Sequence, residues 1–255
     1  MNYTTIFTDA NVVSFLLLFF RFGSLFIAVP IFSHQNIPMI MKSTLAFLFT
    51  IVFYSSMTPV TFEINLPNII IAVVSEIMFG LVIGVILQLA FNVITFAAGL
   101  ISFAMGFSMA SAIDPQSGIS MPIINQFLSL MALMVLFSLN LHHWMLIFIE
   151  SSLSHIPLGG FVMTKSLFTY MIQASANMFV VGFTIAFPII ALSWMSDLIF
   201  GMLMKTMPQF NLLVIGFPIK IMISFAVLIA ILASSMLILQ GQMQDAFNWL
   251  GKLFY

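Results

Sequence analysis

The chain has 255 residues, of which 62% are hydrophobic and only 5% charged. Soluble domains carry about 25% charged residues, and six Lys+Arg with seven Asp+Glu cannot cover a protein surface of this size in water. Composition therefore excludes a soluble enzyme, a disordered chain and a nucleic-acid-binding protein, and it indicates an integral membrane protein. The net charge of −1 gives no information about partners. The absence of cysteine excludes disulfides, thiol catalysis and thiolate metal sites, but it does not fix the compartment.

The charged residues divide the chain into apolar stretches, because each charge is costly at the bilayer centre. A helix needs about 20 apolar residues to cross the hydrocarbon core. The stretches of 20 residues or more without Asp, Glu, Lys or Arg are 22–41, 43–62, 77–113, 115–149, 166–196 and 221–244. They predict an all-α fold with helices at 12–32, 43–58, 68–88, 91–112, 123–147, 167–187, 189–204 and 213–239.

The longer stretches exceed one perpendicular crossing at about 1.5 Å per residue, so each is either a long tilted helix or a hairpin without charged loops. Prolines and polar turns separate the predicted helices, and Phe187-Pro188 kinks or divides the sixth and seventh. The N-terminal tail has no Lys or Arg, whereas Lys42 and Lys252 lie in the first loop and the C-terminal tail. The positive-inside rule then favours an outside N-terminus and an inside C-terminus.

No catalytic or cofactor-binding pattern stands out. The four histidines, at 34, 142, 143 and 155, lack metal-site spacing, and neither a nucleophile elbow nor a phosphate-binding glycine loop occurs. We therefore expect a protein that is not an enzyme and that holds neither a metal nor a cofactor.

Four charges lie within or near the ends of apolar runs, namely Arg21, Glu76, Glu150 and Asp197. Such groups are candidates for an ion pathway. The preferred interpretation is structural pairing, because no segment has the clustered carboxylates of a proton relay. A third alternative is that these helices lie in a large protein assembly rather than in lipid.

Small residues recur four apart, at Glu76-Gly80-Gly84 and at Ala98-Ser102-Gly106-Ala110. This spacing puts each set on one helix face, where another helix can approach closely. The approaching helix belongs either to the same chain or to another subunit, and the sequence leaves both open.

The most unusual stretch is 106–122, which combines small residues, a polar Asp114-Pro115 turn and two prolines between long apolar helices. It is either an exterior loop or a re-entrant element that occludes a channel, since irregular backbone at membrane depth must be buried in protein or line a cavity. The candidate residues in this stretch are Gly106, Met109, Ala110, Asp114, Pro115, Gly118, Met121 and Pro122.

An ordered set of residues in the second half carries a specific resemblance. It runs Asp197, Gly201, Lys205, then Pro208-Gln209-x-Asn211, then Gly216-Phe217-Pro218-x-Lys220. With Arg21-x-Gly23, Pro30, the Glu76-Gly80-Gly84 spacing and the Asp114-Pro115 turn, it resembles the FliR/SctT/SpaR family of type III secretion export-gate subunits over essentially the whole chain. Lys205-Thr206 departs from that pattern, in which an arginine is expected nearby.

The resemblance implies a non-enzymatic subunit that joins FliP and FliQ in a helical, cone-like assembly, much of it lifted out of the bilayer plane. About 1–187 would be FliP-like and about 188–255 a FliQ-like hairpin, in the bacterial inner membrane within the flagellar basal body. Unfolded flagellar proteins would pass along the axis, with FlhB and membrane lipid as further partners and no nucleic acid. The pattern favours a flagellum over an injectisome.

The resemblance further implies that 106–122 is a plug loop, and that 205–220 is the tip of the hairpin. At this tip Gln209, Asn211 and the two lysines contact FlhB or substrate, or else the lysines pair with neighbouring acidic side chains; the sequence leaves both open. Subunit contacts or the cytoplasmic turn are expected at Arg21, Glu76, Gly80, Gly84, Asp197, Lys205, Pro208, Gln209, Asn211, Gly216, Phe217, Pro218 and Lys220. The alternative interpretations are a small-molecule or ion transporter with a site near Arg21 and Glu76, and a purely structural membrane subunit. No internal repeat of the kind common in transporters is evident.

Overall fold

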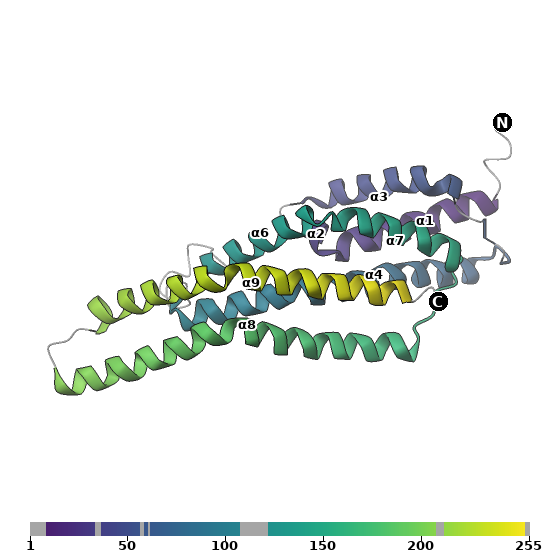
Figure 1. The fold of residues 1–255 in the computed structure, drawn as a ribbon. Helices are drawn as coiled ribbons and strands as arrows, with labels where there is room; N and C mark the ends of the chain where they lie inside the picture. The colour runs from purple at the N-terminus through teal and green to yellow at the C-terminus, as the bar shows by residue number, and fades with distance from the viewer. Residues whose placement is uncertain are drawn as a thin grey trace. The chain divides into compact units, whose positions relative to one another are not determined.

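A computed structural model gives the fold of the chain (Figure 1). It describes residues 9–33, 37–56, 59–60, 62–107, 122–207 and 212–252, and these contain helices and no strand. The helices are α1 (Asp9–Ala28), α2 (Pro30–Ser33), α3 (Met39–Phe53), α4 (Leu66–Ala104), α6 (Ile123–Ser138), α7 (Leu141–His155), α8 (Lys165–Thr206) and α9 (Phe217–Gly251), with a short 3-10 helix η2 (Tyr54–Ser56) and a π-helix η4 (Leu212–Gly216). The predicted all-α membrane class is confirmed.

Two predicted pairs of helices are single helices in the structure. The expected breaks near residues 89–90 and at Pro188 do not occur, because α4 and α8 continue through both positions. Gln88-Leu89-Ala90 contains no residue that disfavours a helix. Proline is tolerated within apolar membrane helices because neighbouring groups satisfy the freed carbonyl. The listed helix ends at these two places were therefore wrong, and the long stretches take the first of the two forms that the sequence left open, a single long helix.

One predicted helix, 123–147, is in fact two. α6 and α7 meet at an angle of 60°, and Asn140 between them has left-handed backbone angles, φ 54° and ψ 30°. Asparagine is among the few residues that adopt this conformation readily. α9 is longer than predicted, because it extends past the predicted end at 239 to Gly251.

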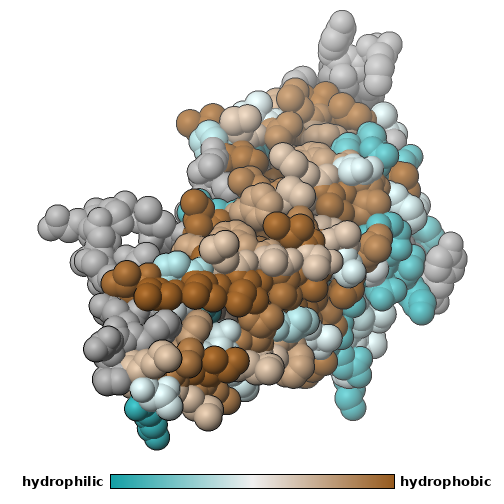
Figure 2. Space-filling view, turned by 60° about the vertical axis from the view of Figure 1, so that its left-hand side comes forward, coloured by the Kyte–Doolittle hydropathy of each residue, from teal (hydrophilic) through white to brown (hydrophobic). Residues whose placement is uncertain are grey.

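The described helices are suited to a membrane by length and composition. α1, α4, α8 and the helical stretch Val214–Gly251 are each long and apolar enough to cross a bilayer, and α6 with α7 supplies a fifth crossing if the bent pair counts as one. Figure 2 shows one face of the molecule, on which apolar side chains cover most of the surface. The chain is thus a multi-pass membrane protein.

The chain forms two compact units. The first comprises Met1–Ala90, Leu136–Ala174 and Met243–Tyr255, and the second comprises Phe91–Val135 and Ser175–Gln242. In the first unit, α1 packs on α3, and Phe22 lies between Phe26 and the α3 rings of Phe49 and Phe53, with ring centroids 5.5–6.3 Å apart.

Glycines let α4 approach α1 closely in the first unit. A Cβ on Gly80 would overlap the side chain of Ser24 and lie 2.8 Å from the backbone nitrogen of Leu25. A Cβ on Gly84 would overlap the Ala28 methyl group and lie 2.9 Å from its carbonyl carbon. The small-residue face of α4 therefore packs within the chain, one of the two alternatives that the sequence left open.

In the second unit, α4 packs on α8 in the same manner. A Cβ on Gly182 would lie 2.7 Å from the ring of Phe96 and 3.0 Å from the carbonyl oxygen of Val93. Ser193 Oγ donates a hydrogen bond of 2.7 Å to the carbonyl oxygen of Ala104. Small and hydroxyl side chains of α8 thus face α4.

The close approach of α4 to α1 predicts a contrast between two glycine-to-alanine substitutions. Gly84→Ala introduces overlap with Ala28 and should lower stability by about 1–3 kcal/mol, as overpacking does. Gly23→Ala on α1 meets no atom within 4 Å, so it should leave stability unchanged or raise it, because alanine favours helix over glycine by about 1 kcal/mol. Thermal unfolding of the two purified variants in the same detergent measures the difference; equal midpoints would contradict the packing shown here.

Candidate functional site

The strongest polar contact in the first unit is an ion pair between α1 and α4. Arg21 Nε donates to Glu76 Oε2 at 2.5 Å, and Arg21 Nη2 donates to Glu76 Oε1 at 2.9 Å. Both side chains are 0% exposed. This two-point geometry matches the planar guanidinium to the carboxylate and is among the stronger hydrogen-bond arrangements in proteins.

The pair also holds the turn that follows α7. Arg21 Nη2 donates to the carbonyl oxygen of Ile156 at 3.3 Å, and Nη1 donates to Ser152 Oγ at 3.4 Å. The backbone N–H of Gly159 donates to Glu76 Oε1 at 2.6 Å. A buried ion pair is tolerated only when its remaining donors and acceptors are satisfied, and these bonds meet that need. The result is a polar clasp joining α1, α4 and the 156–160 turn.

Apolar and glycine contacts complete the clasp. The guanidinium carbon of Arg21 lies 4.6 Å from the ring centroid of Phe79, a cation–π contact. Gly159 has φ +76°, and a Cβ there would lie 2.8 Å from the Ala72 methyl group. Glycine is therefore required at 159 by both conformation and space.

Sequence reasoning found the two charges but not their other partners. The preferred interpretation, structural pairing, agrees with the contacts seen, whereas Ser152, Ile156 and Gly159 were not singled out. The Pro157-Leu158-Gly159-Gly160 run was a visible signal of a turn, but nothing in the sequence brings that turn to Glu76. The role of Arg21 and Glu76 as contacts with other subunits stays a prediction, since their bonds here lie within one chain.

A second ion pair lies between α8 and α9 in the second unit. Lys220 Nζ donates to Asp197 Oδ1 at 2.8 Å and to Oδ2 at 2.9 Å. The Lys220 side chain is 8% exposed and that of Asp197 is 56% exposed. The structure thus brings together two of the residues predicted near the hairpin tip, through a contact within the chain.

The other predicted tip residues are only partly described. Lys205 and Pro218 are exposed, and Gly216 is buried. Pro208, Gln209 and Asn211 lie outside the described residues. The contacts proposed for this tip therefore stay predictions.

The predicted plug loop is described only at its ends. Gly106 has φ +87° and its position faces the Phe217 ring, which a Cβ would contact at 3.5 Å. Pro122 directly precedes α6. The remaining candidates, Met109, Ala110, Asp114, Pro115, Gly118 and Met121, lie outside the described residues.

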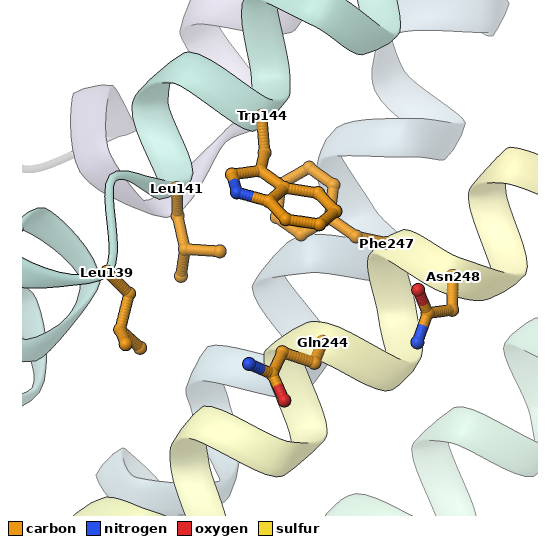
Figure 3. Close-up of a pocket in the computed structure, with 6 residues that line it drawn as sticks. All are labelled: Leu139, Leu141, Trp144, Gln244, Phe247 and Asn248. Atoms are coloured by element: carbon orange, nitrogen blue, oxygen red, sulfur yellow. The ribbon is translucent and has the colours of Figure 1, made fainter.

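A pocket of about 260 Å³ opens in the first unit between the start of α7 and the end of α9 (Figure 3). Its lining is mixed: aliphatic and aromatic side chains come from α7 and the residues just before it, and α9 supplies one aromatic ring and two amides. The lining residues are Leu139, Leu141, Trp144, Gln244, Phe247 and Asn248. It contains no charged group, and within the described ranges no cluster of three or more His, Asp or Glu side chains is placed to hold a metal ion.

Comparison with known proteins identifies the family of this chain. The model of the family described as "Bacterial export proteins, family 1" matches residues 12–246. The chain belongs to this family. It is 36% identical to the flagellar biosynthetic protein FliR of Bacillus subtilis over 85% of each chain. It is 26% identical to FliR of Escherichia coli over 96% of each, and 28% identical to FliR of Pectobacterium carotovorum over 82% of this chain and 80% of that one.

The matched range contains both ion pairs. Arg21, Glu76, Asp197 and Lys220 all lie between residues 12 and 246, and each pair joins helices far apart in the sequence. In this member of the bacterial export proteins, three of the charges in or near apolar runs, Arg21, Glu76 and Asp197, therefore join helices of the same chain.

Removing one partner of the buried pair should be far more harmful than removing both. Arg21→Met leaves the Glu76 carboxylate buried without its cation, at a cost of about 3–5 kcal/mol. The double variant Arg21→Met/Glu76→Leu removes both charges, and we expect it to recover much of the yield and thermal stability in detergent. Glu63→Gln, at an exposed position, is the control and should behave as the unaltered chain. A double variant no better than Arg21→Met would show that the pair is needed for more than charge balance.

Proposed function

We propose that this chain is a subunit of the flagellar type III protein export gate. The observation that carries the proposal is the family match over residues 12–246, together with flagellar relatives aligned along most of both chains. The membrane-spanning helices support it, because an export subunit must lie in the inner membrane. The chain would act without catalysis, in a channel for unfolded flagellar proteins.

In finer detail, the chain would complete a FliP/FliQ/FliR channel and lie beside FlhB. About 1–187 would correspond to a FliP-like part and about 188–255 to a FliQ-like hairpin. The support for these partners and this division is the resemblance in the sequence. The exposed apolar surface of α8 and α9 supports it in a general way, since such surfaces meet either lipid or other subunits.

A transporter is the less favoured function. Its predicted site at Arg21 and Glu76 has no free coordination, because each side chain is fully buried and bonded within the chain. A substrate would have to break the pair before binding, at a high cost for each exposed charge. The family match gives no separate support to a transporter.

The partners are tested by purification from the native host. We expect a tagged chain in mild detergent to recover FliP and FliQ in one large stable complex, identified by mass spectrometry. A second tagged inner-membrane protein of similar abundance serves as the control for non-specific recovery. A monomer or homodimer free of these proteins would overturn the proposal and favour the transporter.

The proposed plug at 106–122 predicts a separate phenotype. Deleting 110–118 should allow ions to leak across the inner membrane and slow growth when the subunit is expressed with its partners. A transporter would instead lose uptake, and a purely structural subunit would show neither effect. Measurement of membrane potential with and without expression distinguishes the three, and the intact chain at equal abundance is the control.

A further inference from the structure

The pocket between α7 and α9 lies wholly within the first unit and combines an apolar interior with an open aromatic ring (Figure 3). Its innermost lining is apolar, because Leu141 and Phe247 are only 3% and 7% exposed. Trp144 stands on the α7 side, with its ring centroid 6.3 Å from that of Phe247. Trp144 is 53% exposed, so more than half of its surface is accessible to a ligand.

The α9 side of the pocket supplies two amides that lie one helical turn apart. Gln244 and Asn248 are both exposed, and none of the residues that the structure describes bonds to either side-chain amide. A primary amide has one acceptor oxygen and two N–H donors. Figure 3 shows Trp144 on α7 and both amides on α9, on either side of the pocket. Both amides are therefore available to a ligand that lies against the ring.

The pocket lies beyond the apolar part of α9. Residues 221–239 contain no charged or amide side chain. Residues 240–252 contain four amides and two charges, namely Gln240, Gln242, Gln244, Asn248, Asp245 and Lys252. Tryptophan is enriched where hydrocarbon meets water, and Trp144 lies opposite this polar end of α9. A ligand with polar groups can therefore reach the pocket from water or from the headgroup region.

The lining disfavours charged and purely apolar ligands. The lining residues carry no charge, so a phosphate or carboxylate group would lose its water without gaining an opposite charge. A hydrocarbon chain would cover the two amides without bonding them, which would leave polar groups unsatisfied. The class that remains is a neutral molecule with one apolar face and several hydrogen-bonding groups.

A neutral sugar ring has both properties. The axial C–H groups of a pyranose form an apolar face, and their hydrogens carry the small positive charge that the negative face of an indole attracts. The hydroxyl groups around its rim both donate and accept, and so does a primary amide. A peptide segment matches the amides less well, because each of its backbone groups either only donates or only accepts.

We propose that this pocket binds one neutral pyranose ring, which stacks on Trp144 and bonds to Gln244 and Asn248 through its hydroxyl groups. The ring belongs either to a free saccharide or to the headgroup of a neutral glycolipid, since both present the same chemistry. The lining residues belong to neither ion pair, and the proposal does not depend on the export function.

Saturation-transfer NMR on the full-length chain, together with the subunits that co-purify with it, tests the proposal. The complex is held in phospholipid nanodiscs, so that no glycoside detergent occupies the pocket. The probes are the methyl β-glycosides of glucose, galactose and N-acetylglucosamine. We expect the axial ring protons of at least one glycoside to receive more saturation than its methyl group, because they contact the indole. Absence of saturation from all three glycosides would overturn the proposal.

Matched variants locate the binding. Trp144→Ala and Asn248→Leu should each weaken it by about tenfold or more, as truncation of a central contact does. Trp194→Ala and Gln173→Leu are the controls, because they remove an exposed tryptophan and an exposed amide from α8, and both should leave binding unchanged. Trp144→Phe keeps a smaller ring and should lose less affinity than Trp144→Ala. Unaltered binding by Trp144→Ala and Asn248→Leu, or an equal loss in the controls, would contradict the site.

A lipid probe distinguishes the two sources of the sugar. Nanodiscs that contain the diacylglycerol glycoside of the sugar that binds present the same ring at the membrane surface. A glycolipid ligand predicts that this lipid displaces the methyl glycoside, whereas a free saccharide predicts an unchanged methyl glycoside signal. If an uncharged peptide, acetylated Gly-Leu-Gly amide, binds and no glycoside does, the pocket is a polypeptide site and the proposal is overturned.

Discussion

The requirement that polar groups be satisfied inside the protein governs this structure. Hydrocarbon offers no hydrogen-bonding partner, and this chain has few charges. Each buried ionic group must therefore pair with an opposite charge on another helix. The Arg21–Glu76 pair does so on α1 and α4, and its spare donors and acceptors hold the turn after α7. The pair therefore sets which helices are neighbours in the first unit and where the chain turns towards α8.

The same constraint operates in the second unit with a different outcome. Lys220 is nearly buried while its partner Asp197 is half exposed, so this pair lies at a boundary rather than in a core. The hydroxyl groups of Thr184 and Ser235 bond to carbonyl oxygens of their own helices, and that of Ser193 bonds to the carbonyl oxygen of Ala104 on α4. The first ion pair thus lies in a core, whereas the second lies partly at the surface.

Glycine placement connects these contacts to helix packing. Gly80 and Gly84 let α4 lie directly on α1, which brings Glu76 within reach of Arg21. Gly159 fits against Ala72 and places its N–H on the same carboxylate. Gly182 allows α8 to approach α4 closely, as Gly84 allows α4 to approach α1. Close packing and charge pairing thus depend on each other, because a helix held farther away would leave the charge unpaired.

Composition and charge spacing alone determined the membrane class, the all-α fold and the approximate place of most helices, since the cost of a charge in hydrocarbon is a property of single residues. The motif around Asp197, Pro218 and Lys220 was enough to indicate the family. Sequence could not decide that α8 continues through Pro188 or that Asn140 divides α6 from α7, because proline and asparagine act according to their surroundings. It also could not choose between a neighbouring subunit and the same chain as the partner of Glu76 and Gly80. That choice depends on which distant segments meet, and only tertiary packing brings residues 21, 76 and 159 to one place.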